Sequence, residues 1–577
     1  MKRRVARTTP ALLACLILAA VGLVPASASA DDDGPLDGYK HIVVIYEENH
    51  SFDNLYGNWG KVNGQRVIGR SAATEANTTQ VDADGAAYPC LLMSDVNLMS
   101  PPLSADCSDT TFSFGVNKPT TAYHFANAPF NIDTFIPATA TTCPPATELF
   151  SHPFGVLDGQ GRSGGCTRDM VHRFYQEQYQ INGGQQNRYV TGSDSAGMTM
   201  GFYDTTKLPI YKYLHSRKAP NYVVLDQFFQ AAFGGSFLNH QYLVAAAAPQ
   251  FAAGTHAVLD GNGFPNAGYP LYHPATGVVD GAVTQACGLT TTVAGFACGD
   301  YAVNTVQPWY QPSSVFGARI PPLDDTSTAL TIGDRLTDAD VSWAWYSGGW
   351  DNASGNTAGR GWTNGTGPTT CSDPNSVPAA PDGAGHGGFP YCPDLSFQTH
   401  HQPFNYYARY APGQPDRAHL QDEQDFLYAA EKGKLPAVSF VKPLGEENEH
   451  PGYASEPKGS DHLVDLIKAI ESGPQAKSTL IVVTYDEFGG QWDHVSPPGT
   501  GSTLGAHDLF GPGTRIPTLV IGRGIGRDGV DHTVYDTTSI MRTIEEQWHL
   551  QPVASRDAVV NDLGHAVNAG HGRGGHD

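Results

Sequence analysis

Residue types that could bind a metal ion stand directly after two short apolar runs of the sequence. They are Glu47, Glu48 and Asn49 after the run 41–46, and Asp486 and Glu487 after the run 479–485. Adjacent carboxylates repel one another and are costly to hold beside a core, so a cation between them would explain their placement. Carboxylate and amide oxygens suit a hard divalent ion, or zinc with oxygen ligands. The alternative is that both groups are solvated turn residues.

A serine in the segment 221–248 could supply a nucleophile. The segment runs from an apolar stretch through Gly234 and Gly235 to Ser236, and then into a helix-like stretch. Two glycines permit a close backbone approach, and the free N–H groups of a helix N-terminus favour an anion. Ser236 could therefore be a nucleophile that the metal ion activates. The alternative role is an ordinary N-cap of the helix.

Histidines in polar segments complete the set of candidate site residues. They are His172, His400, His401, His450 and His494. Each one alone could be a surface or hydrogen-bonding residue, but together they could bind an oxyanion in a chain that is poor in lysine and arginine. Imidazoles become cationic as the pH falls toward about 6, which favours acidic working conditions.

The apolar runs that must position these residues are typical of buried strands. Such runs cover 41–46, 221–229, 341–348, 437–444, 479–487 and 516–522. Helix-like segments lie between several of them. One is 460–473, whose apolar residues on one face are Leu463, Leu466, Ile467 and Ile470. This alternation predicts an α/β fold with a mainly parallel central sheet flanked by helices. Ligands of such sheets bind beyond the carboxyl ends of the strands, where both acidic groups stand.

The first 30 residues have the pattern of a signal peptide. Four basic residues precede an apolar run, and Ala28-Ser29-Ala30 would form the cleavage site. The apolar run is shorter than the about 20 residues that span a bilayer, and no later stretch approaches that length. We therefore expect secretion, periplasmic or extracellular, through the Sec route, while Arg3-Arg4 leaves the twin-arginine route open.

The charge of the chain limits its partners. The net charge is −23, and loss of a basic signal peptide would make it more negative. Such a chain repels nucleic acid and anionic membrane surfaces, and no local basic patch is visible. We expect no nucleic-acid partner and no stable membrane insertion, and the sequence leaves the oligomeric state open.

Eight cysteines outside the signal peptide suggest four disulfides in an exported chain. Their spacing favours local closure of the pairs Cys90–Cys107, Cys143–Cys166, Cys287–Cys298 and Cys371–Cys392. A zinc site, the alternative, would require Cys-x-x-Cys spacing, which does not occur. The loop-like stretches around these cysteines predict insertions near 58–170, 250–330 and 350–398 in a single catalytic domain, 31–552. The Gly/His-rich residues 553–577 predict a flexible tail.

Seven motifs, spread over about residues 40–550, carry a family resemblance. They are EENHSFDNLYG, FGGSFLNH, HHQPF, ENEHPG, VTYDEFGGQWDHVSPP, GTRIPTLVIGRG and YDTTSIMRTIEEQW. They resemble motifs of the bacterial phosphoesterase family that contains secreted acid phosphatases and non-specific phospholipases C. The resemblance implies an alkaline-phosphatase/sulfatase-like fold, a site assisted by one divalent metal ion, and a covalent phosphoryl-enzyme step.

The resemblance also assigns roles to individual residues. It implies that the metal ligands are Glu48, Asn49, Asp486 and Glu487, and that Ser236 is the nucleophile. The histidines that would bind phosphate or protonate the leaving group are His172, His400 or His401, and His450. Asp493 and His494 would orient the metal-bearing loop.

The nucleophile separates two branches of this family. Phospholipases C of the family tend to carry a threonine in a Pro-Asn-Arg context, whereas this chain has Ser236 after two glycines. We therefore expect a broad-specificity acid phosphatase that acts on small phosphomonoesters through a phosphoserine. The alternative is a phospholipase C acting on phosphatidylcholine-type lipids. The aromatic-rich segment 342–351 could contact a lipid, or it could pack over the edge of the sheet. A secreted binding protein without turnover would be marked by loss of Ser236 or of a metal ligand, and none is missing.

Overall fold

The computed structural model describes most of the chain from Leu36 onward. The longer described ranges are 38–82, 84–92, 124–134, 169–193, 196–249, 329–362, 397–452, 455–501 and 503–571. Cys107 and the short segments 283–285, 296–298, 307–308, 319–320 and 322–323 are also described. The chain divides into the segment Met1–Gly34 and a unit, Pro35–Asp577, that contains all the elements named below. The predicted signal peptide lies outside the described residues.

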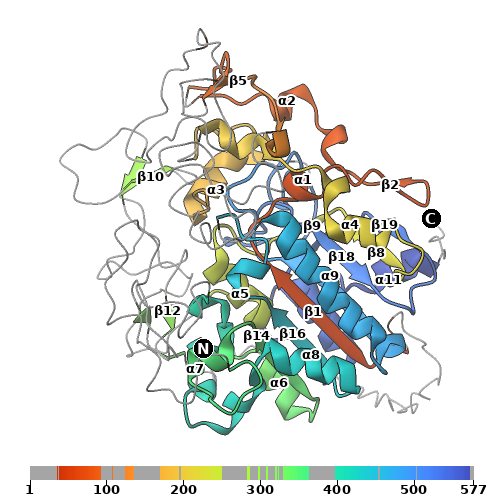
Figure 1. Cartoon of the computed structure of the whole chain (residues 1–577). Coiled ribbons are helices and arrows are strands. Elements are labelled where there is room, and N and C mark those ends of the chain that lie inside the picture. The colour runs from red at the N-terminus through yellow and green to blue at the C-terminus, as the bar shows by residue number, and fades with distance from the viewer. Residues whose placement is uncertain are drawn as a thin grey trace, which may run out of the picture. The chain divides into compact units, whose positions relative to one another are not determined.

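Among the described residues, eight strands form one central sheet (Figure 1). In spatial order they are β15 (Leu420–Asp422), β14 (Trp343–Ser347), β16 (Val438–Lys442), β1 (His41–Glu47), β17 (Thr479–Tyr485), β18 (Thr518–Ile521), β8 (Tyr222–Leu225) and β19 (Gly529–Asp531). Of these eight strands, β18 alone runs antiparallel to its neighbours. All six predicted apolar runs supply strands of this sheet. The prediction of an α/β fold with a mainly parallel sheet is therefore confirmed.

Strand β1 lies at the centre of the sheet, between β16 and β17. Figure 1 shows this red N-terminal strand beside cyan β16, which comes from the C-terminal half of the chain. Residues 42–47 of β1 and every residue of β17 are buried. Strands covered on both faces must be apolar throughout, which explains the continuous runs in the sequence.

Helices of different lengths surround the sheet. They are α1 (Phe52–Leu55), α2 (Glu75–Thr78), α3 (Phe174–Ile181), α4 (Pro209–Leu214), α5 (Ser236–Ala245), α6 (Ile332–Asp338), α7 (Trp350–Ser354), α8 (Glu423–Lys432), α9 (Glu456–Ser472), α10 (Thr538–Gln547) and α11 (Gly564–His571). Helix α9 packs against α4 and α8, and α5 packs against α6 and α10. No helix among the described residues combines the length and apolar character that crossing a membrane requires.

Helix α9 confirms the predicted helical segment 460–473 and extends it at the N-terminal end. The four apolar residues predicted to share one face are buried. The helix begins earlier because Ser455 caps it, accepting a hydrogen bond from Lys458 N. It ends at Ser472, with Gly473 in the C-cap position.

Short strand pairs accompany the main sheet. They are β2 (Lys61–Val62) with β3 (Gln65–Arg66), β4 (Leu91–Leu92) with β5 (His124–Phe125), β6 (Phe130–Asn131) with β7 (Gly201–Phe202), β9 (Phe228–Phe229) with β20 (Tyr535–Asp536), β10 (Val283–Gln285) with β11 (Phe296–Cys298), and β12 (Gln307–Pro308) with β13 (Arg319–Ile320). The predicted disulfide Cys90–Cys107 is confirmed. Each of the other three predicted pairs includes a cysteine outside the described part of the chain. Much of the three predicted insertions also lies outside the described residues.

The C-terminal residues differ from the prediction of a flexible tail from residue 553. Helix α11 lies within that segment and contacts β8 and β19. Leu563, Ala566 and Val567 are buried. The prediction is wrong for this part of the chain, because three apolar side chains at helical spacing are enough to cover the edge of the sheet.

Candidate active site

The carboxyl ends of β1 and β17 bring the two predicted acidic groups together. The strands are parallel and in register, with Glu47 opposite Tyr485. The residues that follow each strand therefore meet at one edge of the sheet. There Asn49 N donates a hydrogen bond to Asp486 Oδ1 at 3.2 Å, and Asp486 N donates to Glu47 O at 3.1 Å.

All four predicted metal ligands, Glu48, Asn49, Asp486 and Glu487, are 0% exposed. Within the described part of the chain, Asn49 Oδ1, Asp486 Oδ2 and Glu487 Oε1 have no hydrogen-bond partner. An unsatisfied buried polar group costs about 1–3 kcal/mol. A divalent cation would satisfy these oxygens, so the residues fit the oxygen-rich metal site that the sequence predicts. The alternative of solvated turn residues is wrong, since none of the four is exposed.

The charges of this group are strongly coupled. Burial raises the pKa of Glu48 and of Glu487 well above the usual range, and the neighbouring Asp486 carboxylate raises both further. Lys442, at the end of β16, acts to lower the pKa of Glu48, because its Nζ forms an ion pair with Glu48 Oε1. Lys442 Nζ also donates to Tyr46 O at 3.0 Å. Sequence reasoning missed Lys442, because a lone lysine at the end of an apolar run is informative only once the neighbouring strands are known.

Ser236 is the first residue of α5 and faces the metal-ligand group. Its Oγ donates to Glu48 Oε2 at 3.3 Å. The N-cap of α5 is Gly235, which forms no side-chain capping bond. The hydroxyl is therefore directed at the acidic group and not at the helix backbone, which removes the N-cap alternative.

The two glycines before Ser236 are required by the shape of the loop. Gly234 has a φ of +91°, and a Cβ on it would lie 2.7 Å from Phe174 N. A Cβ on Gly235 would lie 3.0 Å from His172 Cδ2. Left-handed backbone combined with close neighbours admits only glycine at position 234.

Two buried side chains fix this loop against the rest of the site. Glu177 Oε2 accepts a hydrogen bond from Gly234 N at 2.6 Å. Gln230 Nε2 donates to Gly234 O at 3.1 Å, and its Oε1 accepts from Phe488 N at 2.9 Å. Gln230 therefore joins the serine loop to the loop that follows Asp486 and Glu487. Neither residue stood out in the sequence, because both lie in ordinary polar positions.

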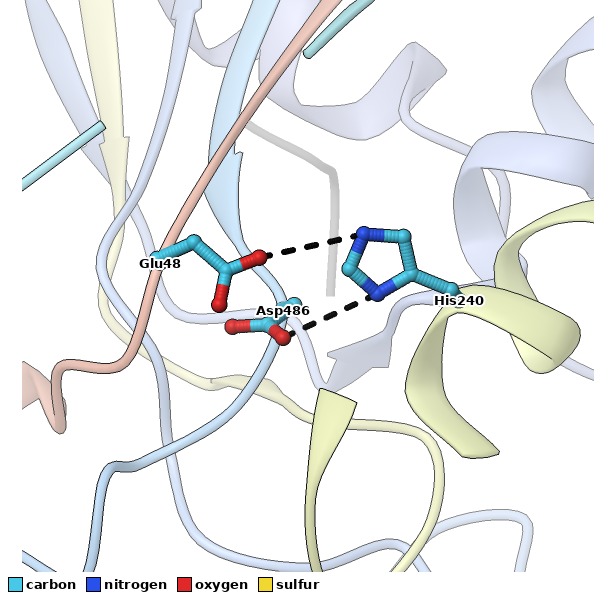
Figure 2. A group of neighbouring side chains, drawn as sticks. All are labelled: Glu48, His240 and Asp486. Carbon is cyan, nitrogen blue, oxygen red and sulfur yellow. Dashed lines mark ion pairs between the residues drawn. The ribbon is translucent and has the colours of Figure 1, made fainter. Parts of the chain in front are cut away.

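His240 is a site residue that sequence reasoning did not assign. Figure 2 shows its ring, carried by α5, beside the carboxylates of Glu48 and Asp486. Its Nε2 lies 3.8 Å from Glu48 Oε1 and its Nδ1 lies 3.7 Å from Asp486 Oδ2. Each of these three residues offers a ligand atom within 4.8 Å of the others. The signal was its position four residues after Ser236, which places both on one face of a helix.

His401 and His400 occupy different positions, as adjacent residues must. His401 Nε2 lies 3.2 Å from Glu48 Oε1, and its ring stacks on that of His240 with centroids 5.1 Å apart. The ring of His400 meets His401 edge-on at 4.3 Å, and its Nδ1 is buried without a hydrogen-bond partner among the described residues. His401 is thus the member of the pair that contacts the acidic group.

His450 and His172 border the site on two further loops. His450 Nδ1 donates to Pro451 O at 2.7 Å, so its Nε2 can accept from Asn49 Nδ2 at 3.0 Å. His172 Nδ1 donates to Met170 O at 2.6 Å, and its Nε2 lies 3.5 Å from Glu487 Oε1. Ser236, His172, His401 and His450 therefore each lie next to a predicted metal ligand, whereas His400 contacts the ring of His401.

Burial disfavours the charged form of three imidazoles in this site. Burial lowers the pKa of His401 and His450 well below the usual range, and lowers that of His400 to about 3. Positive charge at Lys442 acts in the same direction on all three. Protonation near pH 6 is therefore disfavoured for His400, His401 and His450.

The remaining predicted residues, Asp493 and His494, belong to a buried network around Arg515. Arg515 Nε donates to Asp493 Oδ1 at 2.9 Å, and Asp493 Oδ2 accepts from Asp53 N at 3.0 Å. Asp53 in turn accepts from His494 N at 2.9 Å. Arg515 is 0% exposed and also forms an ion pair with Asp53. The network ties the segment after Asn49 to the segment after Glu487, so it holds both halves of the metal-ligand group in place.

The sequence of the chain is similar to those of known proteins, and these similarities identify its family. The chain matches the Phosphoesterase family over residues 39–551. It is 23% identical over 566 residues to "Phospholipase C B" of Mycobacterium tuberculosis, covering 93% of this chain and 78% of that protein. It is 31% identical over 162 residues to "Non-hemolytic phospholipase C" of Pseudomonas aeruginosa, covering 23% of each.

One solved structure with similarity to the chain is a protein in the alkaline phosphatase superfamily from Vibrio parahaemolyticus. Its TM-score is 0.28 with 11% sequence identity, and the match covers 63% of this chain and 65% of that chain. Since the family match extends over nearly the whole described unit, the chain belongs to the Phosphoesterase family of phosphoric-ester hydrolases.

Proposed function

We propose that this protein is a metal-assisted phosphomonoesterase in which Ser236 is the nucleophile. The observation that carries the proposal is the position of Ser236 Oγ, 3.3 Å from Glu48 Oε2 and at the N-terminus of α5. Free N–H groups at a helix N-terminus favour the transferred phosphoryl group. The serine hydroxyl and an anion-binding backbone thus face the same group of buried carboxylates.

The residues that would hold one divalent ion are Glu48, Asn49, Asp486 and Glu487. When bound, such an ion polarises the phosphoryl group and lowers the pKa of a neighbouring hydroxyl. His240 lies close enough to Glu48 and Asp486 to join or support this set. The acidic side chains would therefore supply the binding site for the metal ion, and the metal ion would contact the phosphoryl group of the substrate.

The protein's own residues account for the proton movements. Ser236 Oγ forms a bond to phosphorus as the ester P–O bond breaks, and Glu48 Oε2 accepts the serine proton. His172 donates its Nε2 proton to the leaving alcohol from the imidazolium form, while its Nδ1–H stays bound to Met170 O. Water then attacks the phosphoserine and breaks the bond from Ser236 Oγ to phosphorus. His172 Nε2 takes the proton of the water, Glu48 returns its proton to Ser236 Oγ, and phosphate is released. His401 would contact the phosphoryl oxygens, whereas His450, whose Nε2 accepts from Asn49 Nδ2, would position that metal ligand.

Replacing the nucleophile tests this mechanism. We expect Ser236→Ala to lower kcat for p-nitrophenyl phosphate by at least about a thousand-fold, because no other group replaces the attacking oxygen. The metal content of the purified variant should equal that of the parent protein. Ser216→Ala, at an exposed position, is the matched control and should retain full activity. Full activity in Ser236→Ala would disprove the mechanism.

A phospholipase C activity is the second candidate, favoured by the names of the relatives reported above. Assays of p-nitrophenyl phosphate and phosphatidylcholine side by side at pH 5–7 separate the two. We expect the monoester to be preferred, since serine replaces the threonine typical of the phospholipase branch. A preference of ten-fold or more for the lipid would reverse the assignment.

We further propose that the protein is exported, on the support of the signal-peptide pattern in residues 1–30.

A further inference from the structure

A second group of metal-ligating side chains lies away from Ser236, and the proposed function does not use it. It consists of Glu423 at the start of α8, Glu447 in the turn Gly445–Glu447, and His462 in α9. His462 Nε2 lies 3.1 Å from Glu423 Oε1 and 3.8 Å from Glu447 Oε2. One ligand atom of each residue lies within 4.8 Å of the other two. The three residues come from elements that pack against one another.

Oxygens without a hydrogen-bond partner in and beside this group indicate a cation-binding site. The side chain of Glu423 is 3% exposed, and its Oε2 has no hydrogen-bond partner among the described residues. Glu47, at the end of β1, is 0% exposed, and in the same part of the chain neither of its carboxylate oxygens has such a partner. Successive residues of an extended strand point to opposite faces, so Glu47 is directed away from the face that Glu48 presents to Ser236.

Glu47 shares the electrostatic environment of this group. The carboxylates of Glu423 and Glu447 repel the carboxylate of Glu47, whereas Lys442 and His462 attract it. Lys442 already forms an ion pair with Glu48 on the other side of the strand. One imidazole thus stands against three carboxylates, two of them fully buried. Such an excess of buried negative charge is costly without a further cation.

We propose that Glu423, Glu447 and His462 bind a second divalent metal ion, with Glu47 as a neighbouring carboxylate that the ion would stabilise. Metal–ligand distances of about 2.0–2.2 Å place two ligand atoms of one ion roughly 3–4 Å apart. The observed separations of 3.1 and 3.8 Å match this spacing. A donor set that mixes carboxylate and imidazole suits Zn²⁺ or Mn²⁺ better than Ca²⁺.

The position of this second site indicates a supporting role. The turn with Glu447 leads directly into Asn448, whose carbonyl accepts a hydrogen bond from Glu48 N at 3.0 Å. His450, the partner of Asn49, follows two residues later. An ion that joins this turn to α8 and α9 would therefore fix the loop that borders the active site.

Zinc titration of the full-length protein after chelator treatment tests the proposal. We expect isothermal titration calorimetry with ZnCl₂ to show two equivalents bound to the parent protein and two bound to Ser236→Ala. The double variant Glu423→Gln/His462→Gln should bind one equivalent. Glu431→Gln, an exposed glutamate of the same helix, is the matched control and should bind two.

A milder variant keeps the test valid if the double variant does not fold. Glu447 is the most exposed of the three ligands, with a side chain that is 35% exposed. Glu447→Gln should weaken one of the two zinc sites by at least about ten-fold and leave the other unchanged. Unchanged zinc binding in Glu423→Gln/His462→Gln or in Glu447→Gln would overturn the proposal, whatever the number of equivalents in the parent protein. Because Ser236→Ala keeps both ions, failure here is distinguishable from failure of the proposed catalytic mechanism.

Discussion

Burial disfavours the charged form of His400, His401 and His450 in the active site. The sequence places these residues in polar segments, which suggests ordinary imidazoles that gain a proton near pH 6. The structure instead packs His400 and His401 between other imidazoles and Lys442, where a positive charge is poorly solvated and repelled. Neutral imidazoles can still orient a phosphoryl group through hydrogen bonds. An acidic optimum, if measured, would therefore need a cause other than simple protonation of these rings.

The lowered pKa of His400 makes a prediction about stability. Its folded-state pKa of about 3 lies below the value of about 6.5 for an unfolded chain. Below pH 6.5 the unfolded chain binds a proton that the folded protein does not, so the free energy of unfolding falls as the pH decreases toward 3. His400→Asn should reduce this slope by up to about 1.4 kcal/mol per pH unit.

Urea denaturation of the parent and of His400→Asn between pH 4 and 6.5 measures the slope. His507→Asn, at an exposed position, is the control and should follow the parent. Identical slopes for the parent and His400→Asn would show that the imidazole of His400 is not held neutral by the fold.

At the scale of elements, the serine loop and α5 determine where the nucleophile lies. Gly234 takes a left-handed conformation directly against the backbone of Phe174, and Glu177 and Gln230 bind its N–H and C=O. The position of Ser236 thus depends on the backbone before α5 as much as on the helix itself.

Gly234→Ala should separate this positional effect from ordinary backbone strain. Gly413 also has a positive φ, but a Cβ on it would meet nothing within 4 Å. Both alanine variants should lose about 1–2 kcal/mol of stability from the left-handed backbone. Only Gly234→Ala should also lose about a hundred-fold in kcat/KM, because the loop must move and carry Ser236 with it. Equal activity of the two variants would contradict the role assigned to the loop.

Sequence patterns predicted the long buried elements and missed the short ones. Continuous apolar runs predicted six strands of the sheet, since burial on both faces requires such runs. Strands β15 and β19 have three residues each and include polar side chains, so they leave no clear periodic signal. The start of α9 before residue 460 depends on a single capping serine, Ser455. Helix α11 was missed because it has only a few apolar residues in a Gly/His-rich segment.

For the whole molecule, the order of strands decides which residues meet. Glu48 and Asp486 are far apart in the sequence but adjacent in space because β1 pairs with β17. The metal-ligand group was predictable because its residue types stand at strand ends. Lys442 and Arg515 were not, since a lone basic residue becomes informative only once its strand neighbours are known. Arg515 illustrates this: it is fully buried between Asp53 and Asp493, which come from opposite ends of the chain.

The central claim is that Ser236 forms a covalent bond to phosphorus during turnover. The stereochemical course at phosphorus tests it directly, with a substrate made chiral by oxygen isotopes and an alcohol as the acceptor. Attack by Ser236 followed by attack of the acceptor inverts the configuration twice, so the account predicts overall retention. Inversion would show a single direct displacement and would contradict the account.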